Sequence, residues 1–256
     1  RAFYGLASQI SNMKNKNGLH TNALYGFHNM VEAKIKAIQP THALVAFDAG
    51  KTTFRNEFFE DYKGGRDAMP AELSEQMPYF RELLDGLGIE YYELENYEAD
   101  DIIGTLAKEA EEQGFETVIM TGDRDLAQLA SGHIQVDFTK KGDFDEITPD
   151  YLEEVYGLSP EQVPDYLGLK GDPSDNIPGV TGIGEKRAQS LLDQFGSLDA
   201  LYEQIDELKP SKMKENLIEQ EEVARLSKKL ATINREAPLQ ITVDDLEYPG
   251  KDLEKL

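Results

Sequence analysis

Apolar positions in the first half of the chain follow two alternating patterns. Stripes spaced at three and four residues predict amphipathic helices, and short continuous apolar runs bounded by polar turns predict buried strands. The alternation of the two signals indicates a mostly parallel, doubly wound α/β sheet. The predicted helices cover residues 22–38 and 98–113, and the predicted strands cover residues 42–47, 89–94, 117–121 and 134–138.

The second half of the chain carries no further strand signals. Thr148 and Ser159 each precede a proline and look like the caps of helices, because a hydroxyl side chain followed by proline suits the first helical position. The pattern stays mostly helical afterwards. We therefore expect an α/β core over residues 1–147 and a helical region over residues 148–256.

Three carboxylates open the predicted helix at residues 98–113. Glu98, Asp100 and Asp101 lie in one stretch of four residues. Acidic side chains at the start of a helix complement the positive end of the helix dipole, and this stretch alone favours that interpretation. The strands on either side of it favour another.

Aspartates follow two of the predicted strands directly. The strand 42–47 runs into Asp48, and the strand 117–121 is followed by Asp123 and Asp125. Because ligands bind at the carboxyl ends of strands in open α/β sheets, these aspartates and the acidic helix start predict one acidic pocket. Carboxylates packed together repel one another, and a divalent cation removes that conflict. A site made only of oxygen ligands favours Mg²⁺ or Mn²⁺ over zinc.

Two features stand out in the helical region. Asp172 and Asp175 add two carboxylates on one turn, although an Asx-turn or a helix cap explains the same spacing. The turn 179–184 places glycines before a helix, where backbone N–H groups suit a phosphate. Lys186 and Arg187 lie in the first turn of that helix, where the dipole disfavours cations and a phosphate would explain them. A plain helix–helix turn is the alternative interpretation.

Composition narrows the possible functions. The chain of 256 residues has 26 Lys and Arg against 49 Asp and Glu, a net charge of −23. Contact with a polyanion must therefore be local, and the segment 51–81 is locally basic and partly aromatic. The absence of cysteine excludes disulfides and thiol catalysis, and the four histidines are scattered. No signal peptide or membrane-spanning apolar run appears, so we expect a cytoplasmic protein without membrane contact.

Taken together, several stretches make the chain resemble the 5′-nuclease domain of bacterial DNA polymerase I, a family of structure-specific 5′→3′ exonucleases and flap endonucleases. They occur in the family's order and span nearly the whole chain. The resemblance implies a Rossmann-like nuclease core followed by a helix-hairpin-helix region, with that motif at about 172–196. The matching stretches are Phe47-Asp48-Ala49, Phe54-Arg55, Asp61-Tyr62-Lys63-Gly64-Gly65-Arg66, Tyr97-Glu98-Ala99-Asp100-Asp101, Thr121-Gly122-Asp123-Arg124-Asp125-Leu126, Gly171-Asp172-Pro173-Ser174-Asp175-Asn176-Ile177-Pro178-Gly179-Val180 and Gly182-Ile183-Gly184-Glu185-Lys186.

The resemblance also implies hydrolysis of DNA phosphodiesters near a 5′ end or flap junction by two divalent metal ions, in replication and repair. The expected partner is a 5′-flap, nicked or branched duplex, and the expected protein is a monomer. The carboxylates that match the family's metal ligands are Asp48, Glu98 and Asp100 for the first ion, Asp123, Asp125 and Asp172 for the second, and Asp101 and Asp175 in supporting positions.

The segment at about 51–81 matches the family's arch, which threads the 5′ strand. Lys63 and Arg66 would act there as catalytic residues on the scissile phosphate, and Tyr62 would either stack on an unpaired base or pack at the base of the arch. The glycine turn would hold duplex backbone, often with K⁺ on its carbonyls. The residues expected to contact DNA are Arg1, Arg55, Tyr62, Gly179, Gly182, Gly184, Lys186 and Arg187.

Family members carry one more metal-ligand aspartate just before the position of Arg1. We therefore expect a short apolar strand upstream of Arg1 in the natural protein and weaker binding of the first metal ion by these 256 residues alone. The resemblance also allows a polymerase region after Leu256. Two alternatives stay open: a nuclease that acts mainly on RNA or RNA–DNA hybrids, and a non-catalytic junction-binding module whose metal site has decayed.

Overall fold

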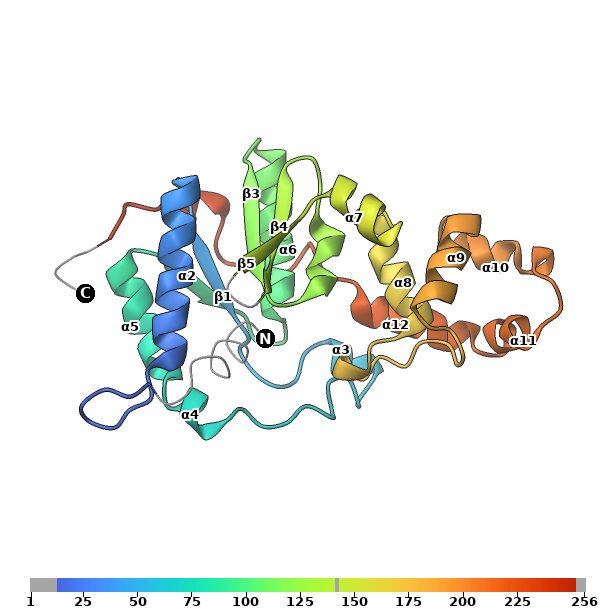
Figure 1. The fold of residues 1–256 in the computed structure, drawn as a ribbon, viewed down its shortest axis with the longest axis horizontal. Coiled ribbons are helices and arrows are strands. Elements are labelled where there is room, and N and C mark those ends of the chain that lie inside the picture. Colours follow the sequence, from blue (N-terminus) through green and yellow to red (C-terminus); the bar gives the residue numbers. More distant parts are fainter. Residues whose placement is uncertain (1–12, 141–142, 252–256) are drawn as a thin grey trace.

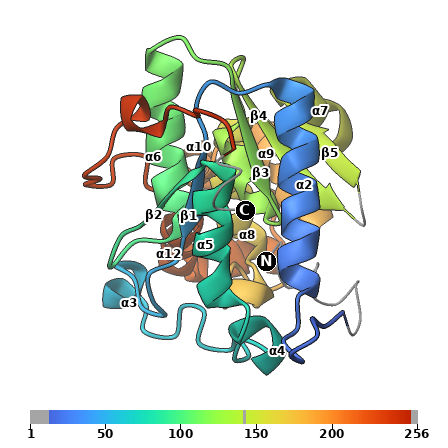
Figure 2. The ribbon, with the colours of Figure 1, turned by 90° about the vertical axis from the view of Figure 1, so that its left-hand side faces the viewer.

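A computed structural model describes residues 13–140 and 143–251. The molecule is elongated, with an α/β part at one end and a group of short helices at the other (Figure 1). The connection that carries helices α3 and α4 runs below the sheets in both views (Figures 1 and 2). The arrangement confirms the predicted α/β class, with a helical second half.

The first sheet consists of two parallel strands whose register runs from Leu44 opposite Glu90 to Phe47 opposite Glu93. Two long helices pack against it, and Phe27 of the first meets Phe80 of the second edge to face, with ring centroids 5.4 Å apart. The elements of this part are α2 (Asn22–Ile38), β1 (Leu44–Phe47), α3 (Arg55–Phe58), α4 (Ala71–Ser74), α5 (Met77–Leu87) and β2 (Glu90–Glu93).

The second sheet consists of β3 (Thr117–Thr121), β4 (Ile134–Lys140) and β5 (Asp143–Ile147). Strands β3 and β4 are parallel, whereas β5 returns antiparallel to β4. Sequence analysis missed β5 because this acidic stretch has no apolar run, and pairing with β4 outweighs its weak strand propensity. Among the described residues the strands form two separate sheets rather than the single sheet that we expected.

Helix α6 (Ala99–Glu112) packs against both β1 and β3 and so joins the two sheets. Its first turn forms a capping box, in which the side chain of Asp101 accepts a hydrogen bond from the backbone N–H of Glu98 at 3.1 Å. The stretch after β3 forms the short 3₁₀ helix η1 (Arg124–Leu129).

The second half of the chain is helical, as predicted. Thr148 and Ser159 act as N-terminal caps, since the hydroxyl of Thr148 accepts from the backbone N–H of Tyr151 and Ser159 forms a capping box with Gln162. None of the helices in the described part of the chain is both long and apolar enough to span a membrane. The elements here are α7 (Pro149–Tyr156), η2 (Pro160–Gln162), α8 (Val163–Lys170), η3 (Pro173–Asp175), α9 (Glu185–Phe195), α10 (Leu198–Glu203), η4 (Ile205–Glu207), α11 (Lys212–Glu219), α12 (Glu221–Ala231) and η5 (Val243–Leu246).

Helix α8 belongs to two apolar cores at once. Leu167 packs in the core that also contains Ile119 and Val136 of the second sheet. Leu169, two residues later, packs in the core of the terminal helices with Leu192. Helix α12 packs along α8 and likewise contributes to both cores. The helical half is therefore bound to the α/β part by shared apolar packing.

A buried ion pair fastens α2 to the second sheet. Asp137 of β4 is fully buried, and Lys34 of α2 forms an ion pair with it. The Lys34 ammonium also lies 4.5 Å from the centre of the Phe144 ring. The side-chain amide of Gln135 donates to Asp137 at 2.6 Å, so the carboxylate has two donors in a site without water access.

Replacing Lys34 by methionine should destabilise the fold by about 3–5 kcal/mol, because it leaves the Asp137 carboxylate buried without its counter-charge. Chemical denaturation monitored by circular dichroism measures this change. Lys36→Met on the exposed side of the same helix is the matched control and should alter stability by less than about 0.5 kcal/mol. Equal stability of the two variants would show that the pair does not hold α2 in place.

Candidate metal centre and nucleic-acid interface

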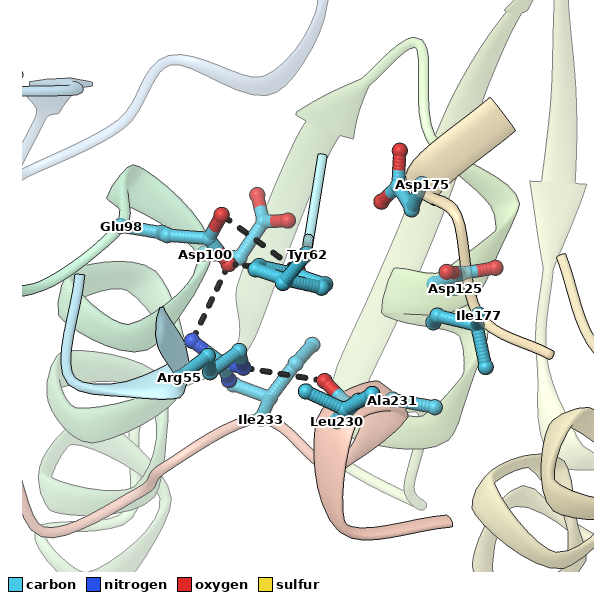
Figure 3. Close-up of a pocket in the computed structure, with 10 residues that line it drawn as sticks. All are labelled: Arg55, Tyr62, Glu98, Asp100, Asp125, Asp175, Ile177, Leu230, Ala231 and Ile233. Atoms are coloured by element: carbon cyan, nitrogen blue, oxygen red, sulfur yellow. Dashed lines mark hydrogen bonds and ion pairs between the residues drawn. The ribbon is translucent and has the colours of Figure 1, made fainter. Parts of the chain in front are cut away.

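Carboxylates from several segments converge on one small cavity, and Figure 3 shows Glu98 and Asp100 on one side of it with Asp125 and Asp175 on the other. Asp48 follows β1 and accepts a hydrogen bond from the backbone N–H of Ala99 at 2.8 Å, which ties the end of that strand to the start of α6. The predicted acidic pocket therefore forms at the strand ends, as the sequence pattern indicated.

One group of carboxylates has the spacing of a metal site. Asp123, Asp125 and Asp175 each offer an oxygen atom, and these atoms all lie within 4.8 Å of one another. We expected Asp172 here and Asp175 in a supporting position. Asp172 instead caps η3, where its carboxylate accepts from the backbone N–H and the hydroxyl of Ser174 at 2.9 and 2.7 Å.

The pocket contains more carboxylates than cationic side chains to neutralise them. Burial raises the pKa of Asp100 to about 8, and the negative charges of Asp123, Glu98 and Asp48 add to this effect. Burial likewise raises the pKa of Asp125 to about 8. The charges that add to this second shift are those of Asp123, Asp172, Asp175 and Asp100.

These two sets of neighbours divide the pocket. The charges that raise the pKa of Asp100 include those of Glu98 at the start of α6 and of Asp48. The charges that raise the pKa of Asp125 include those of Asp172 and Asp175 at η3. Asp123 acts on both. An all-oxygen donor set with uncompensated charge fits a hard divalent cation, since such an ion favours the ionised form of every carboxylate around it.

Glu98 is buried and is held by three donors. The guanidinium of Arg55 donates to Oε2 at 3.0 Å, the Tyr62 hydroxyl donates at 3.2 Å, and the Lys63 ammonium pairs with Oε1. Asp101 is fully buried and differs from its neighbours, because Arg55 donates to both of its oxygens at 2.8 Å. Its carboxylate is already neutralised and serves the fold of the site.

The two basic residues of the expected arch point into the acidic pocket. Lys63 lies 3.9 Å from Asp175 in addition to its contact with Glu98, and Arg66 forms an ion pair with Asp175. Lys63 adopts a left-handed backbone conformation (φ 57°), and its N–H donates to the carbonyl of Asp175 at 2.9 Å. The contacts between the two segments outweigh the strain of that conformation.

The η3 loop is closed by two glycines that pack against each other. Gly171 and Gly179 both have positive φ, and a Cβ atom on Gly179 would lie 2.3 Å from the nitrogen of Gly171. No side chain fits where the two backbones meet, so glycine is required there for the chain to fold back on itself. The resulting loop holds Asp175 toward the pocket. The side chain of Asn176 donates to the carbonyl of Asp61 at 2.7 Å, which fixes the loop to the arch.

The turn 179–184 leads into α9 as predicted. Gly182 and Gly184 are exposed, as are Lys186 and Arg187 in the first turn of the helix. The Arg187 guanidinium donates to the carbonyl of Gly182 at 2.7 Å. The start of α9 is thus an exposed group of backbone N–H donors with two cations beside it.

Three residues that we expected to contact DNA are buried in the structure. Arg55 is 2% and Tyr62 is 5% exposed, because Arg55 neutralises Asp101 and the Tyr62 ring packs in the apolar core. Both side chains are therefore enclosed by protein, and the Tyr62 ring packs at the base of the arch. Gly179 is buried and its N–H donates to the Ser227 hydroxyl at 2.9 Å. Arg1 lies outside the described residues.

The floor of the pocket comes from the end of α12, which sequence analysis did not single out. Leu230, Ala231 and Ile233 line a cavity of about 20 Å³, which holds a water molecule or a bare ion and excludes a nucleotide. An apolar stretch after a helix carries no signal of such a role. Only the three-dimensional packing shows it.

Family models match both halves of the chain. Residues 1–157 match a family model described as 5′-3′ exonuclease, N-terminal resolvase-like domain, and residues 158–254 match one described as 5′-3′ exonuclease, C-terminal SAM fold. The two meet somewhat later than the boundary that we expected near residue 147. DNA polymerase I of Bacillus caldotenax is 56% identical over 258 residues and that of Lactococcus lactis is 55% identical over 260 residues. All of this chain is matched, and it spans 29–30% of those relatives' length.

Solved structures share the fold at low sequence identity. A bacteriophage T5 flap endonuclease in complex with DNA and metal ions superposes with a TM-score of 0.75 at 22% identity, covering 91% of this chain and 86% of that one. The T5 5′-exonuclease with bound zinc gives 0.69 at 24% identity, with 82% and 81% covered. The catalytic core of Rad2 with DNA gives 0.54 at 19% identity, covering 99% and 77%. With both family models matched along its length, this chain belongs to the 5′-3′ exonuclease family.

Proposed function

We propose that the chain hydrolyses DNA phosphodiesters at 5′ ends and 5′-flap junctions with two divalent metal ions. The observation that carries the proposal is the uncompensated charge of the pocket, where Asp100 and Asp125 both have a pKa of about 8. Carboxylates with raised pKa values in a cleft are typical of functional sites. Membership of an exonuclease family gives the class of reaction.

The two sets of carboxylates would hold the two ions. Asp48, Glu98 and Asp100 would form one site, and Asp123, Asp125 and Asp175 the other, with Asp172 close to the second. Donors of this type suit Mg²⁺ or Mn²⁺. When bound, such ions activate a water molecule and stabilise the leaving oxygen of an in-line displacement.

Lys63 and Arg66 would exchange partners when substrate arrives. In the structure they neutralise Glu98 and Asp175, which are the carboxylates that metal ions would claim. Once released, both cations would lie beside the scissile phosphate and stabilise its growing negative charge. The left-handed backbone at Lys63 keeps its side chain at this position.

The duplex would be held away from the acidic pocket. A chain with a net charge of −23 must bind DNA through a local surface, and the start of α9 offers backbone N–H donors together with Lys186. K⁺ fits this turn less well, because the carbonyls of Val180, Thr181 and Gly182 already accept hydrogen bonds from within the protein. We therefore assign it no role.

The relatives named DNA polymerase I support a role of the proposed activity in DNA replication and repair, and we expect it to act in the cytoplasm. The experiment that tests the proposal is cleavage of a 5′-labelled flap duplex with Mg²⁺ and with EDTA. An RNA flap of the same sequence forms a second arm and tests the alternative of an RNA nuclease. Absence of cleavage in every condition, with intact junction binding, would favour a binding module instead.

Asp125→Asn should lower flap cleavage by about 100-fold or more, because the loss of a direct ligand exceeds the effect of losing an outer partner. Junction affinity, measured by fluorescence anisotropy, should change little, since most DNA affinity comes from phosphate contacts elsewhere. Asp193→Asn, an exposed aspartate of α9, is the charge-matched control and should cleave normally. Full activity of the Asp125 variant at ordinary Mg²⁺ would remove this residue from the metal site.

Binding of Mg²⁺ should release protons near neutral pH. Asp100 and Asp125 have pKa values raised to about 8, so both are mostly protonated at pH 7 in the metal-free protein and must ionise to bind a cation. Titration calorimetry in two buffers of different ionisation enthalpy should give about one to two protons released at pH 7 and fewer at pH 9. Mg²⁺ affinity should therefore rise with pH up to about 8 and then level off. Binding without proton release at pH 7 would contradict the assignment.

Lys186→Ala should weaken duplex binding and reduce the slope of log affinity against log salt by about one, as expected for the loss of one phosphate contact. Lys186 is chosen over Arg187 because Arg187 also supports the turn through Gly182. Lys209→Ala removes the same charge from an exposed site after α10 and should leave the slope unchanged. An unchanged slope in the Lys186 variant would exclude this helix start from the DNA interface.

A further inference from the structure

Arg55 is the most completely bonded side chain of the site. All five of its N–H groups have an acceptor within 3.0 Å. Two go to the two oxygens of Asp101 and one to Oε2 of Glu98. The remaining two go to the backbone carbonyls of Leu230 and Thr232. An arginine that is 2% exposed and bonded in this way has no freedom to move.

The two carbonyls belong to the carboxyl end of α12, which carries the negative end of a helix dipole and lacks intrahelical donors. Arg55 therefore joins three segments: its own helix α3, the start of α6 and the end of α12. Asp101 adds to the junction, because its Oδ1 also accepts from the backbone N–H of Asn234 at 2.8 Å.

The bond to Glu98 has a consequence for the metal centre. Arg55 holds Oε2 at 3.0 Å, whereas Oε1 is contacted by the Lys63 ammonium and, at 3.5 Å, by the Tyr62 hydroxyl. Lys63 is a long side chain on the arch, 15% exposed, whereas Arg55 is enclosed on all sides. When a cation binds this carboxylate, we expect Lys63 to move away and Arg55 to keep its hydrogen bond to Oε2.

We propose that Arg55 is a positioning residue of the metal centre. It fixes Glu98 so that Oε1 is the atom offered to a metal ion, and it holds this carboxylate at a set position relative to the end of α12. The inference rests on the proposed function, in that Glu98 is taken as a metal ligand. It extends that function by giving the site a link to the DNA-binding half. Ser227 of α12 accepts from Gly179, so the glycine turn, α12, Arg55 and Glu98 form one bonded series.

Direct binding of Mn²⁺, measured by the electron paramagnetic resonance signal of the free ion and without DNA, tests the role. Arg55→Lys keeps the charge but cannot reach five acceptors, and it should lower Mn²⁺ affinity about 10- to 100-fold, as losing a partner of a ligand does. Arg225→Lys is the matched control, since Arg225 lies on the outer side of α12 and pairs with Asp199 and Glu221. Its Mn²⁺ affinity should equal that of the wild type.

A double-mutant cycle with Glu98→Gln separates positioning from general support of the fold. If Arg55 acts through Glu98, Arg55→Lys should add no further loss of Mn²⁺ affinity to Glu98→Gln. Fully additive losses would overturn the proposal, and so would a loss of the same size in Arg225→Lys. Equal Mn²⁺ affinity of wild type and Arg55→Lys overturns this inference alone, whereas a wild type that binds no Mn²⁺ overturns the proposed function with it.

A measurement on the wild-type protein tests the same role and does not depend on the folding of an Arg55 variant. The Nε–H of Arg55 donates to Leu230 in a buried site, so its resonance should be protected from exchange and resolved from those of exposed arginines. Addition of Mg²⁺ should shift this resonance, because a cation on Glu98 changes the field at the guanidinium. A resonance that does not move when Mg²⁺ is bound would show that Arg55 does not hold the ligand.

Discussion

Mutual repulsion among carboxylates is the constraint on which the site depends. The ends of two strands, the start of α6 and the η3 loop bring their aspartates to one place, and two of these have a pKa of about 8. Each nearby cation is drawn in as a result. Arg55 neutralises Asp101 permanently, whereas Lys63 and Arg66 reach the pocket from the arch and hold Glu98 and Asp175. The pocket thus has one fully buried counter-charge and two that come from partly exposed side chains.

This division explains why neighbouring carboxylates with the same sequence signature serve different ends. Asp100 and Asp101 are adjacent in the chain and both lie in the first turn of α6. Asp101 points to the buried guanidinium of Arg55, while Asp100 faces the other carboxylates, and burial together with their charges raises its pKa. A helix places consecutive residues on different sides, so one turn supplies both a structural ion pair and a candidate metal ligand.

The sequence predicted the parts of the site that follow from local pattern. Strands ending in Asp48 and Asp123 and the acidic start of α6 are recognisable because their residues are close in the chain, and the structure brings these side chains together. The burial of Arg55 and Tyr62 depends on contacts with Asp101, Glu98 and the end of α12, which lie far away in sequence. The grouping of Asp175, rather than Asp172, with Asp123 and Asp125 depends on the fold of η3, where Ser174 donates to Asp172. The strand β5 forms only because β4 is beside it.

Helix α8 joins the two parts of the chain that the family models describe separately. It lies just beyond the junction of the two family models, yet its Leu167 packs in an apolar core with Ile119 and Val136 from before that junction. The junction therefore divides the matched sequence but not the apolar packing of the chain. Recombination at that point would join halves whose inner surfaces were shaped by other partners. Residues on its two sides share one apolar core, so a substitution on one side limits those that the other side accepts.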